Sequence, residues 1–188
     1  VALPETESGE IAPSSADLLL AEMANHDAIV FGPAMIDEEI VRTLLAALLP
    51  ALPADIFLLL DAFALRAAAA HADAIAARGS HTVLTPHEGE LAAMLGADKD
   101  EVSRDPLVAL TLAADRIDAA IMVKGATSHL MAEGMCLSYA GGGLGLAVSG
   151  SGGVLAGLVA GLGGQGLAPL QAPAWGIWLQ GEAGGRLA

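Results

Sequence analysis

The sequence is poor in cysteine and in basic residues. Its 188 residues include one cysteine, Cys136, so neither an internal disulfide nor a cysteine-based zinc site is possible, and a reducing, cytoplasmic compartment is expected. Lysine and arginine number 8 against 22 aspartates and glutamates, a formal net charge of −14. Because such a chain repels phosphodiester backbones and anionic lipid surfaces, we expect no nucleic acid and no membrane among its partners.

Aromatic residues are also scarce, at 3%, so the core has to be built from alanine, valine, leucine and isoleucine. Hydrophobic residues make up 54% of the chain and charged residues 16%. This balance excludes disorder, which requires low hydrophobicity combined with high charge. A chain of this length removes roughly 70% of its unfolded surface from water. We therefore expect a single domain over residues 1–188.

The chain lacks an initiator methionine and a secretory signal. Its first residues contain no basic segment followed by an apolar segment, so we expect no export. The missing methionine makes a processed or trimmed piece of something longer an expectation as well.

Long hydrophobic runs are missing too, although one segment comes close. After Tyr139 only Glu182 and Arg186 are charged, and the run 152–164 contains small and apolar residues alone. Its glycines, at four-residue spacing, resemble the close-packing motif of membrane helix pairs. The run has about 13 residues where a membrane span needs roughly 18, and no lysine or arginine flanks it. We therefore expect a buried helix packed closely on a sheet.

Short apolar runs alternate with segments of helical periodicity. The runs predict buried strands at 28–31, 56–60, 82–84 and 120–123. Helices are predicted over 37–49, from 62 to about 78, over 86–95 and over 104–118, with a hairpin over 130–139. Apolar strands that alternate with helices form a parallel sheet buried on both faces. The fold class is therefore α/β, a mostly parallel central sheet with helices on both faces.

Ligands in such folds bind beyond the carboxyl ends of the strands. The four predicted strand ends are Gly32-Pro33, Asp61, Thr85-Pro86-His87 and Lys124-Gly125-Ala126. A glycine-rich loop, 141–153, also runs directly into a helix near Val154. Unshielded backbone N–H groups at a helix N-terminus bind anions, so the loop indicates a phosphate site, although as a pattern it is weak. No Gly-Lys-Ser/Thr triplet ends the loop, which excludes a P-loop.

Lys124 is one of only two lysines, and two interpretations of it stay open. Its charge at a strand end suits a phosphate, and its position equally fits a surface lysine in a turn.

The segment that follows Val83-Leu84 predicts a helix start. Thr85 as N-cap, Pro86 as the first helical residue and Glu88 as the third would form a capping box, which is a purely structural explanation. His87 and Glu90 are not covered by this explanation. They share a helix face, where they could contact a polar ligand or a hydrated Mg²⁺, and both alternatives stay open.

Taken in order, these segments resemble one family, the ADP- or ATP-dependent NAD(P)H-hydrate dehydratases of the ribokinase-like superfamily, often labelled carbohydrate kinases. The resemblance runs from about residue 28 to residue 184. The strings that carry it are Val30-Phe-Gly-Pro33, Leu59-Leu-Asp-Ala62 with Ala64-Leu65, Val83-Leu-Thr-Pro-His-Glu-Gly-Glu90, Val123-Lys-Gly-Ala126, Gly150-Ser-Gly152 before Val154-Leu-Ala-Gly157, and Gly176-Ile-Trp-Leu-Gln-Gly181. The Thr-Pro-His-Glu-Gly-Glu string and the Gly-Ser-Gly loop are specific together at this spacing.

The resemblance implies a ribokinase-like domain that repairs a damaged nicotinamide. Hydrated NADH or NADPH (NADHX or NADPHX) would lose water at the expense of ADP or ATP, with Mg²⁺, through phosphoryl transfer to the ring hydroxyl and elimination of phosphate. It places Gly32, Ala34 and His87 against this substrate, and Glu90 beside the metal. It places the nucleotide against Lys124, Gly125, Ala126, Thr127, Ser128, Gly150, Ser151 and Gly152. A homo-oligomer is a further expectation.

The sequence departs from the family pattern at the catalytic position. The family's glycine loop ends in an Asp that serves as the base, and here Gly153 stands there. Losing a general base costs about 10²- to 10⁴-fold in rate. Ala34 replaces the third residue of a Gly-Pro-Gly turn, and Phe63 replaces the second Asp of a Leu-Asp-Ala-Asp-Ala-Leu string. The family's N-terminal portion is also expected to be missing and its last helix to be cut short at Ala188, which indicates a fragment or a diverged member.

Two other functions stay open at this stage. Gly153 is compatible with a catalytically impaired nucleotide-binding or scaffold module. A carbohydrate or vitamin kinase of the same superfamily is the other, and the Thr-Pro-His-Glu-Gly-Glu string speaks against it.

Overall fold

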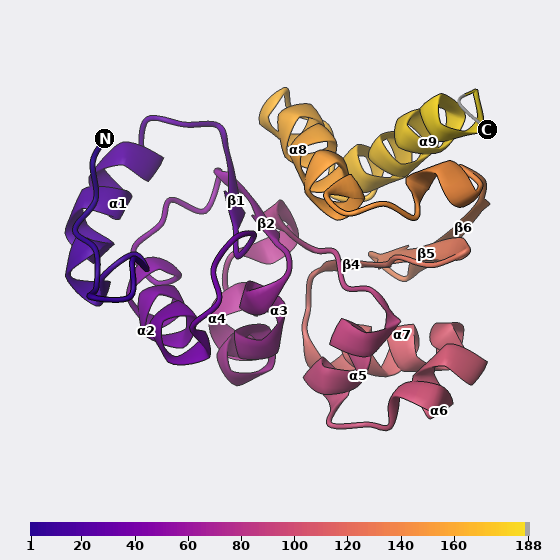
Figure 1. Cartoon of the computed structure of the whole chain (residues 1–188), viewed down its shortest axis with the longest axis horizontal. Coiled ribbons are helices and arrows are strands. Elements are labelled where there is room, and N and C mark those ends of the chain that lie inside the picture. The colour runs from indigo at the N-terminus through magenta and orange to yellow at the C-terminus, as the bar shows by residue number, and fades with distance from the viewer. Residues whose placement is uncertain (187–188) are drawn as a thin grey trace.

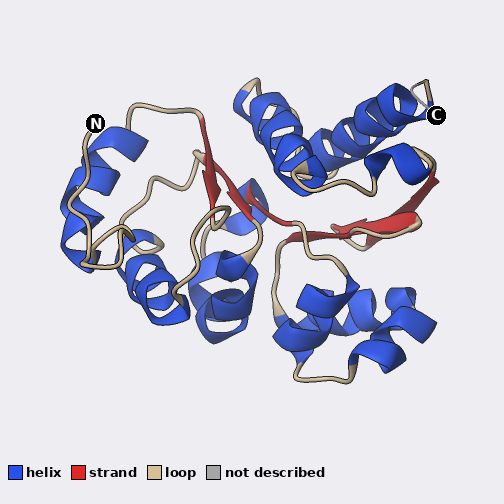
Figure 2. Cartoon of the chain, viewed as in Figure 1, coloured by secondary structure: helices blue, strands red, loops and turns tan. Residues whose placement is uncertain are grey.

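The computed structural model describes residues 1–186 and contains one six-stranded sheet with the strand order β1-β2-β3-β4-β5-β6 (Figure 2). The strands are β1 (Ala28–Phe31), β2 (Phe57–Leu60), β3 (Thr82–Leu84), β4 (Ala120–Val123), β5 (Thr127–Ala132) and β6 (Met135–Ala140). The first four run parallel, and the β5–β6 hairpin joins the sheet antiparallel to β4. The expected mostly parallel sheet and its hairpin are confirmed.

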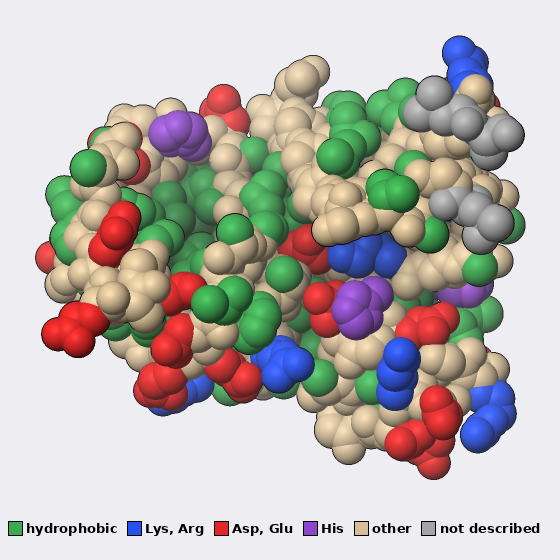
Figure 3. Space-filling model, in the orientation of Figure 1, with side chains coloured by type: hydrophobic (Ala, Val, Ile, Leu, Met, Phe, Trp, Pro, Cys, Tyr) green, Lys and Arg blue, Asp and Glu red, His purple; other side chains and the backbone are tan. Residues whose placement is uncertain are grey.

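Helices cover both faces of this sheet, as expected (Figure 1). Those on one face are α2 (Glu38–Leu48), α3 (Phe63–Ala68), α4 (Ala72–Ala76), α5 (Glu88–Leu95), α6 (Lys99–Arg104) and α7 (Pro106–Arg116), with α1 (Ala16–Met23) packed beside α2. The other face is covered by α8 (Ser151–Gly164) and α9 (Gln171–Gly185). Acidic side chains lie over the first group in the view of Figure 3, whereas α8 and α9 show mostly apolar or uncharged surface.

Alternation along each strand divides the core into two layers. In β2, Leu58 and Leu60 pack into the layer beneath α2 to α7, and Phe57 and Leu59 pack into the layer beneath α8 and α9. All four side chains are buried. A parallel sheet buried on both faces explains why the sequence shows unbroken apolar runs.

Two predicted helices are wrong in detail. The helix expected from 62 to 78 is divided into α3, a 3₁₀ turn at Ala69–His71 and α4. The helix expected over 104–118 is α7, which begins later, at Pro106, because Asp105 caps it, and Arg104 is instead the last residue of α6. The sequence analysis predicts neither α1 nor α6.

The glycine-spaced run forms most of α8 and lies against the sheet. A Cβ atom at Gly163 would stand 2.4 Å from the ring of Phe57, so only glycine lets the helix approach β2 this closely. A Cβ atom at Gly157 would meet nothing within 4 Å. Across residues 1–186, no helix combines the length and the apolar character needed to span a bilayer.

We expect the two α8 glycines to respond oppositely to alanine. Gly163→Ala forces a methyl group into the Phe57 ring and should lower the free energy of unfolding by about 1–3 kcal/mol. Gly157→Ala occupies open space and should raise it by up to about 1 kcal/mol, because alanine is the better helix former. Urea unfolding monitored by circular dichroism measures both. Changes of the same sign would contradict the close packing described for Gly163.

Candidate functional site

A pocket of about 800 Å³ lies at the carboxyl ends of the strands, between the end of β4 and the start of α8. In Figure 3 acidic, basic and histidine side chains gather in the hollow at the centre of the face shown. The pocket is lined by His87, Lys124, Gly125, Ala126, Ser128, Gly141, Gly143, Leu146, Ala147, Val148, Ser151, Gly152, Leu155, Ile177 and Gln180. A second hollow, of about 680 Å³, lies elsewhere and contains none of the predicted site residues.

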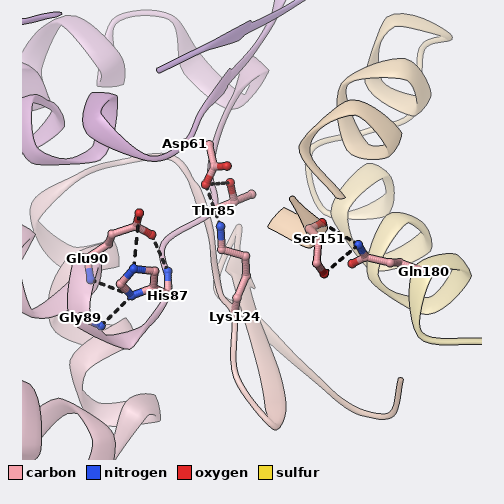
Figure 4. Close-up of polar contacts among 8 residues, drawn as sticks. All are labelled: Asp61, Thr85, His87, Gly89, Glu90, Lys124, Ser151 and Gln180. Carbon is pink, nitrogen blue, oxygen red and sulfur yellow. Dashed lines mark hydrogen bonds and ion pairs between the residues drawn. The ribbon is translucent and has the colours of Figure 1, made fainter. Parts of the chain in front are cut away.

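The carboxylate of Asp61 organises the strand ends beside the pocket. Its Oδ1 accepts a hydrogen bond from Thr85 Oγ1 at 3.0 Å and an ionic hydrogen bond from Lys124 Nζ at 2.7 Å (Figure 4). These residues follow β2, β3 and β4, so one oxygen atom joins three strands. Asp61 is 4% exposed. Lys124 is therefore not a surface lysine in a turn, and one of its two interpretations is wrong.

The turn after β1 packs directly on this centre. A Cβ atom at Gly32 would stand 2.0 Å from the carbonyl oxygen of Asp61, so the turn passes too close for any side chain. Ala34 follows with a φ of 64°, in the left-handed region that favours glycine. Gly32 and Ala34 do not line the pocket; Gly32 packs against Asp61, whose carboxylate binds the pocket residue Lys124.

The segment after Lys124 forms the pocket's floor. The Lys124 N–H donates to the carbonyl of Pro86 at 2.7 Å, which fixes the end of β4 against the end of β3. The N–H of Gly125 donates to Ser128 Oγ at 3.4 Å, closing the turn. Gly125, Ala126 and Ser128 line the pocket, and Thr127 does not.

Helix α5, which follows β3, starts at a different residue from the one predicted. The N-cap of α5 is His87, not Thr85: its Nδ1 accepts from the N–H groups of Gly89 and Glu90, and Glu90 Oε2 accepts from the His87 N–H at 2.8 Å. His87 and Glu90 thus form the capping box themselves (Figure 4). Thr85 is buried, and its hydroxyl group donates a hydrogen bond to Asp61 instead of capping the helix. His87 also lines the pocket, and its Nε2 faces Glu90 Oε1 at 3.6 Å.

The start of α8 presents backbone N–H groups. Gly150 has a φ of 89° and no side chain caps the helix. Within residues 1–186, the N–H groups of Gly152 and Gly153 have no hydrogen-bond partner. A Cβ atom at Gly152 would lie 3.5 Å from Lys124 Nζ, so the ammonium and the helix N-terminus face each other. Together they provide positive charge and free donors, which suit an anion such as phosphate.

Most, but not all, of the predicted site residues gather here. Seven line the pocket: His87, Lys124, Gly125, Ala126, Ser128, Ser151 and Gly152. Glu90, Gly150 and Gly153 do not, although each is next in structure or sequence to one that does. A Cβ atom at Gly153 would meet nothing within 4 Å. The sequence reasoning missed Gln180, on α9, and the role of Asp61, for which its place at a strand end was the available signal.

A hydrated Mg²⁺ is compatible with these residues. Among residues 1–186 no three histidine, cysteine or acidic side chains cluster closely enough to form a complete metal site. Mg²⁺ needs no such cluster, because it takes one or two carboxylates and completes its shell with water and substrate phosphates. Glu90 Oε1 lies 3.6 Å from His87 Nε2, outside hydrogen-bond range, and can serve as such a carboxylate oxygen.

Comparison with known proteins places this geometry in a family. The family model described as NAD(P)H-hydrate dehydratase matches residues 2–188. The chain belongs to the NAD(P)H-hydrate dehydratase family. It is 36% identical over 187 residues to the ADP-dependent (S)-NAD(P)H-hydrate dehydratase of Xanthomonas campestris, covering 99% of this chain and 62% of that protein. It is 35% identical over 185 residues to the bifunctional NAD(P)H-hydrate repair enzyme Nnr of Moorella thermoacetica, covering 98% of this chain and 34% of that protein.

Solved structures confirm the ribokinase-like fold of this family member. A ribokinase-like superfamily protein from Enterococcus faecalis has a TM-score of 0.76 and 22% identity, over 93% of this chain and 60% of that one. The ADP/ATP-dependent NAD(P)H-hydrate dehydratase of Bacillus subtilis, co-crystallised with ATP and Mg²⁺, has a TM-score of 0.69 and 24% identity, over 86% and 58%. The chain thus spans about three fifths of these relatives, and about a third of the bifunctional enzyme.

We expect the Asp61 carboxylate to contribute strongly to the stability of this dehydratase-family chain. Asp61→Asn leaves the Lys124 ammonium without its anion in a largely buried position and should lower the free energy of unfolding by about 2–4 kcal/mol. Glu38→Gln is the matched control, because it removes an exposed partner of Arg66 and should cost less than about 0.5 kcal/mol. Urea titrations compare them. Similar small losses in both variants would contradict a central role for Asp61.

Proposed function

We propose that this chain carries out nucleotide-dependent dehydration of hydrated NADH or NADPH. The observation that carries the proposal is that the Lys124 ammonium lies beside the free N–H groups at the start of α8, in a pocket of suitable size for a nucleotide. The family membership, reported above, supplies the reaction. Such a reaction needs groups that bind phosphate charge, and Lys124 with the free N–H groups of α8 would be these groups.

The nucleotide would lie across the floor of the pocket. Its phosphates would contact Lys124, Ser151 and Gly152, with Gly150 setting the approach of the loop, and its nucleoside would extend along Gly125 to Ser128. The apolar wall made by Leu146, Leu155 and Ile177 suits a base and ribose edge. Phosphoryl transfer depends mainly on positioning and charge neutralisation, and the Lys124 ammonium beside the free N–H groups of α8 supports the proposal on both points.

The hydrated nicotinamide would approach from the side of His87 and of the Gly32–Ala34 turn. In the first step its ring hydroxyl oxygen forms a bond to the terminal phosphorus, the phosphoanhydride bond breaks, and the hydroxyl proton leaves to a base. In the second step the ring C–O bond breaks with loss of the neighbouring C–H proton, which forms a C=C bond and releases inorganic phosphate. Mg²⁺ beside Glu90, when bound, would neutralise phosphate charge during the transfer.

Gly153 favours one alternative, a module that binds nucleotide without turnover. The first turn of α8 carries no carboxylate, so no side chain there can take the hydroxyl proton. We propose that the chain is a slow dehydratase rather than such a module, because seven of the predicted site residues line one pocket.

We also propose that the chain works in the cytoplasm as a homo-oligomer. The first point rests on its cysteine content: Cys136 is exposed and unpaired, which suits a reducing compartment. The second rests only on the resemblance to the family.

We expect ADP or ATP, each with Mg²⁺, to raise the melting temperature of the full chain. A ligand present at 100 times its Kd stabilises the native state by about 2.7 kcal/mol. Lys124→Met should abolish the shift, and Lys99→Met, which removes the chain's other lysine from an exposed position, should preserve it. Differential scanning fluorimetry at millimolar nucleotide measures all three proteins. If nucleotide leaves the unaltered chain's melting temperature unchanged, the assignment of the pocket is wrong.

We expect an aspartate at position 153 to accelerate the reaction. The open space around Gly153 admits the side chain, and a positioned base is worth about 10²- to 10⁴-fold in rate. Gly157→Asp adds the same charge one turn further along α8, also into open space, and should not accelerate it. Turnover of hydrated NADH is followed by the return of dihydronicotinamide absorbance. Turnover only after Gly153→Asp, with none in the unaltered chain, would establish the non-catalytic module.

A further inference from the structure

Gln180 reaches from α9 to the start of α8 and forms part of the pocket wall. Its side chain is largely buried, at 7% exposure, although glutamine is an uncommon residue at buried positions. The amide Nε2 donates to the carbonyl oxygen of Ser151 at 2.7 Å and lies 3.4 Å from Ser151 Oγ (Figure 4). No other side chain within residues 1–186 donates a hydrogen bond to the first turn of α8.

The peptide plane transmits this contact to the pocket. The Ser151 carbonyl and the Gly152 N–H belong to one planar trans peptide unit, so they point in opposite directions and turn together. A donor that holds the carbonyl therefore also fixes the direction of the N–H. Hydrogen bonding at the oxygen polarises the same unit and strengthens the N–H as a donor. That N–H has no partner in the described chain and lies next to Lys124 Nζ.

The helix start needs such an anchor. Gly150, Gly152 and Gly153 surround Ser151, and glycine gives up more backbone freedom on ordering than any other residue. No side chain caps α8, and local support for the turn comes from backbone hydrogen bonds alone, from the Ser151 N–H to Val148 and from the Val154 N–H to Gly150. Gln180, 29 residues further along the chain, supplies support from a rigid neighbouring helix.

Packing between α8 and α9 does not explain this contact. The two helices already meet closely at Gly176, where a Cβ atom would stand 2.6 Å from Val159 Cγ2, and Leu155 and Ala172 are buried in the same layer. An apolar side chain at position 180 would serve that packing at least as well as a buried amide, which costs free energy unless it is hydrogen-bonded.

We propose that Gln180 is a positioning residue, which aims the Gly152 N–H at a phosphate group of the bound nucleotide. The inference rests on the proposed function, because it takes the occupant of the pocket to be a nucleotide. Under this proposal Gln180, which lies outside the glycine-rich loop, contributes to phosphate binding through its hydrogen bond to Ser151.

The test compares phosphate-bearing and phosphate-free ligands on the full chain. Isothermal titration calorimetry measures the Kd of ADP with Mg²⁺ and of adenosine. Gln180→Met keeps the side-chain length and removes the donor, and it should raise the Kd of ADP about three- to tenfold while leaving that of adenosine within twofold. Gln180→Glu replaces the donor by an ionised acceptor and should weaken ADP more strongly. Gln165→Met, at an exposed position after α8, is the control and should change neither.

The outcomes separate this inference from the proposed function. ADP binding that is unchanged in Gln180→Met overturns the inference and leaves the proposed function intact. Equal losses for ADP and adenosine also overturn it, because they indicate a general packing role. No ADP binding by the unaltered chain overturns the proposed function and the inference with it. Gln180→Glu, which retains size and polarity, provides the comparison if Gln180→Met does not fold.

Discussion

The carboxylate of Asp61 ties together the carboxyl ends of three parallel strands. Through Thr85 and Lys124 it fixes β3 and β4 relative to β2, and the Gly32 turn after β1 rests on its backbone. Burying a carboxylate costs folding free energy unless it is paired, so the buried Asp61 requires Thr85 and Lys124 to stay close to it. The same ion pair holds the Lys124 ammonium against the start of α8. The position of the Lys124 ammonium beside the free N–H groups of the pocket is therefore a consequence of how the strand ends are joined.

The α8 side of the pocket depends on how closely α8 packs on the sheet. Glycine permits this close packing, as at Gly163, whose backbone lies against the Phe57 ring. Close approach of α8 to the sheet brings its N-terminus near the end of β4 as well. Two groups of α8 glycines thus differ in their surroundings: Gly163 and Gly164 permit close contact, and Gly152 and Gly153 in the first turn have free N–H groups.

The sequence predicts the sheet well because its strands are short, apolar and bounded by turn residues; the strands at 28–31, 82–84 and 120–123 have the predicted bounds. Helix boundaries are less predictable, since a run such as 62–78 has the right period but alanine gives little preference between one helix and two. The capping box was placed two residues early because Thr85 is the commoner N-cap type, and its burial beside Asp61 depends on a contact 24 residues away. The role of Gln180 could not be predicted for the same reason, because no sequence pattern around it indicates that its side chain contacts Ser151, 29 residues away.

Binding and turnover place different demands on this site. In the proposed function, a phosphate is held by backbone N–H groups and one ammonium; Asp61 pairs with that ammonium, and we propose that Gln180 positions the Gly152 N–H. Removing a proton requires a base at the start of α8, and Gly153 has no side chain to provide one. Because phosphate binding and proton removal depend on different atoms, proton removal can be lost while phosphate binding is kept. In the proposed function, the residues that would bind phosphate and the position that would carry the base are therefore distinct, although they lie within a few residues of each other at the start of α8.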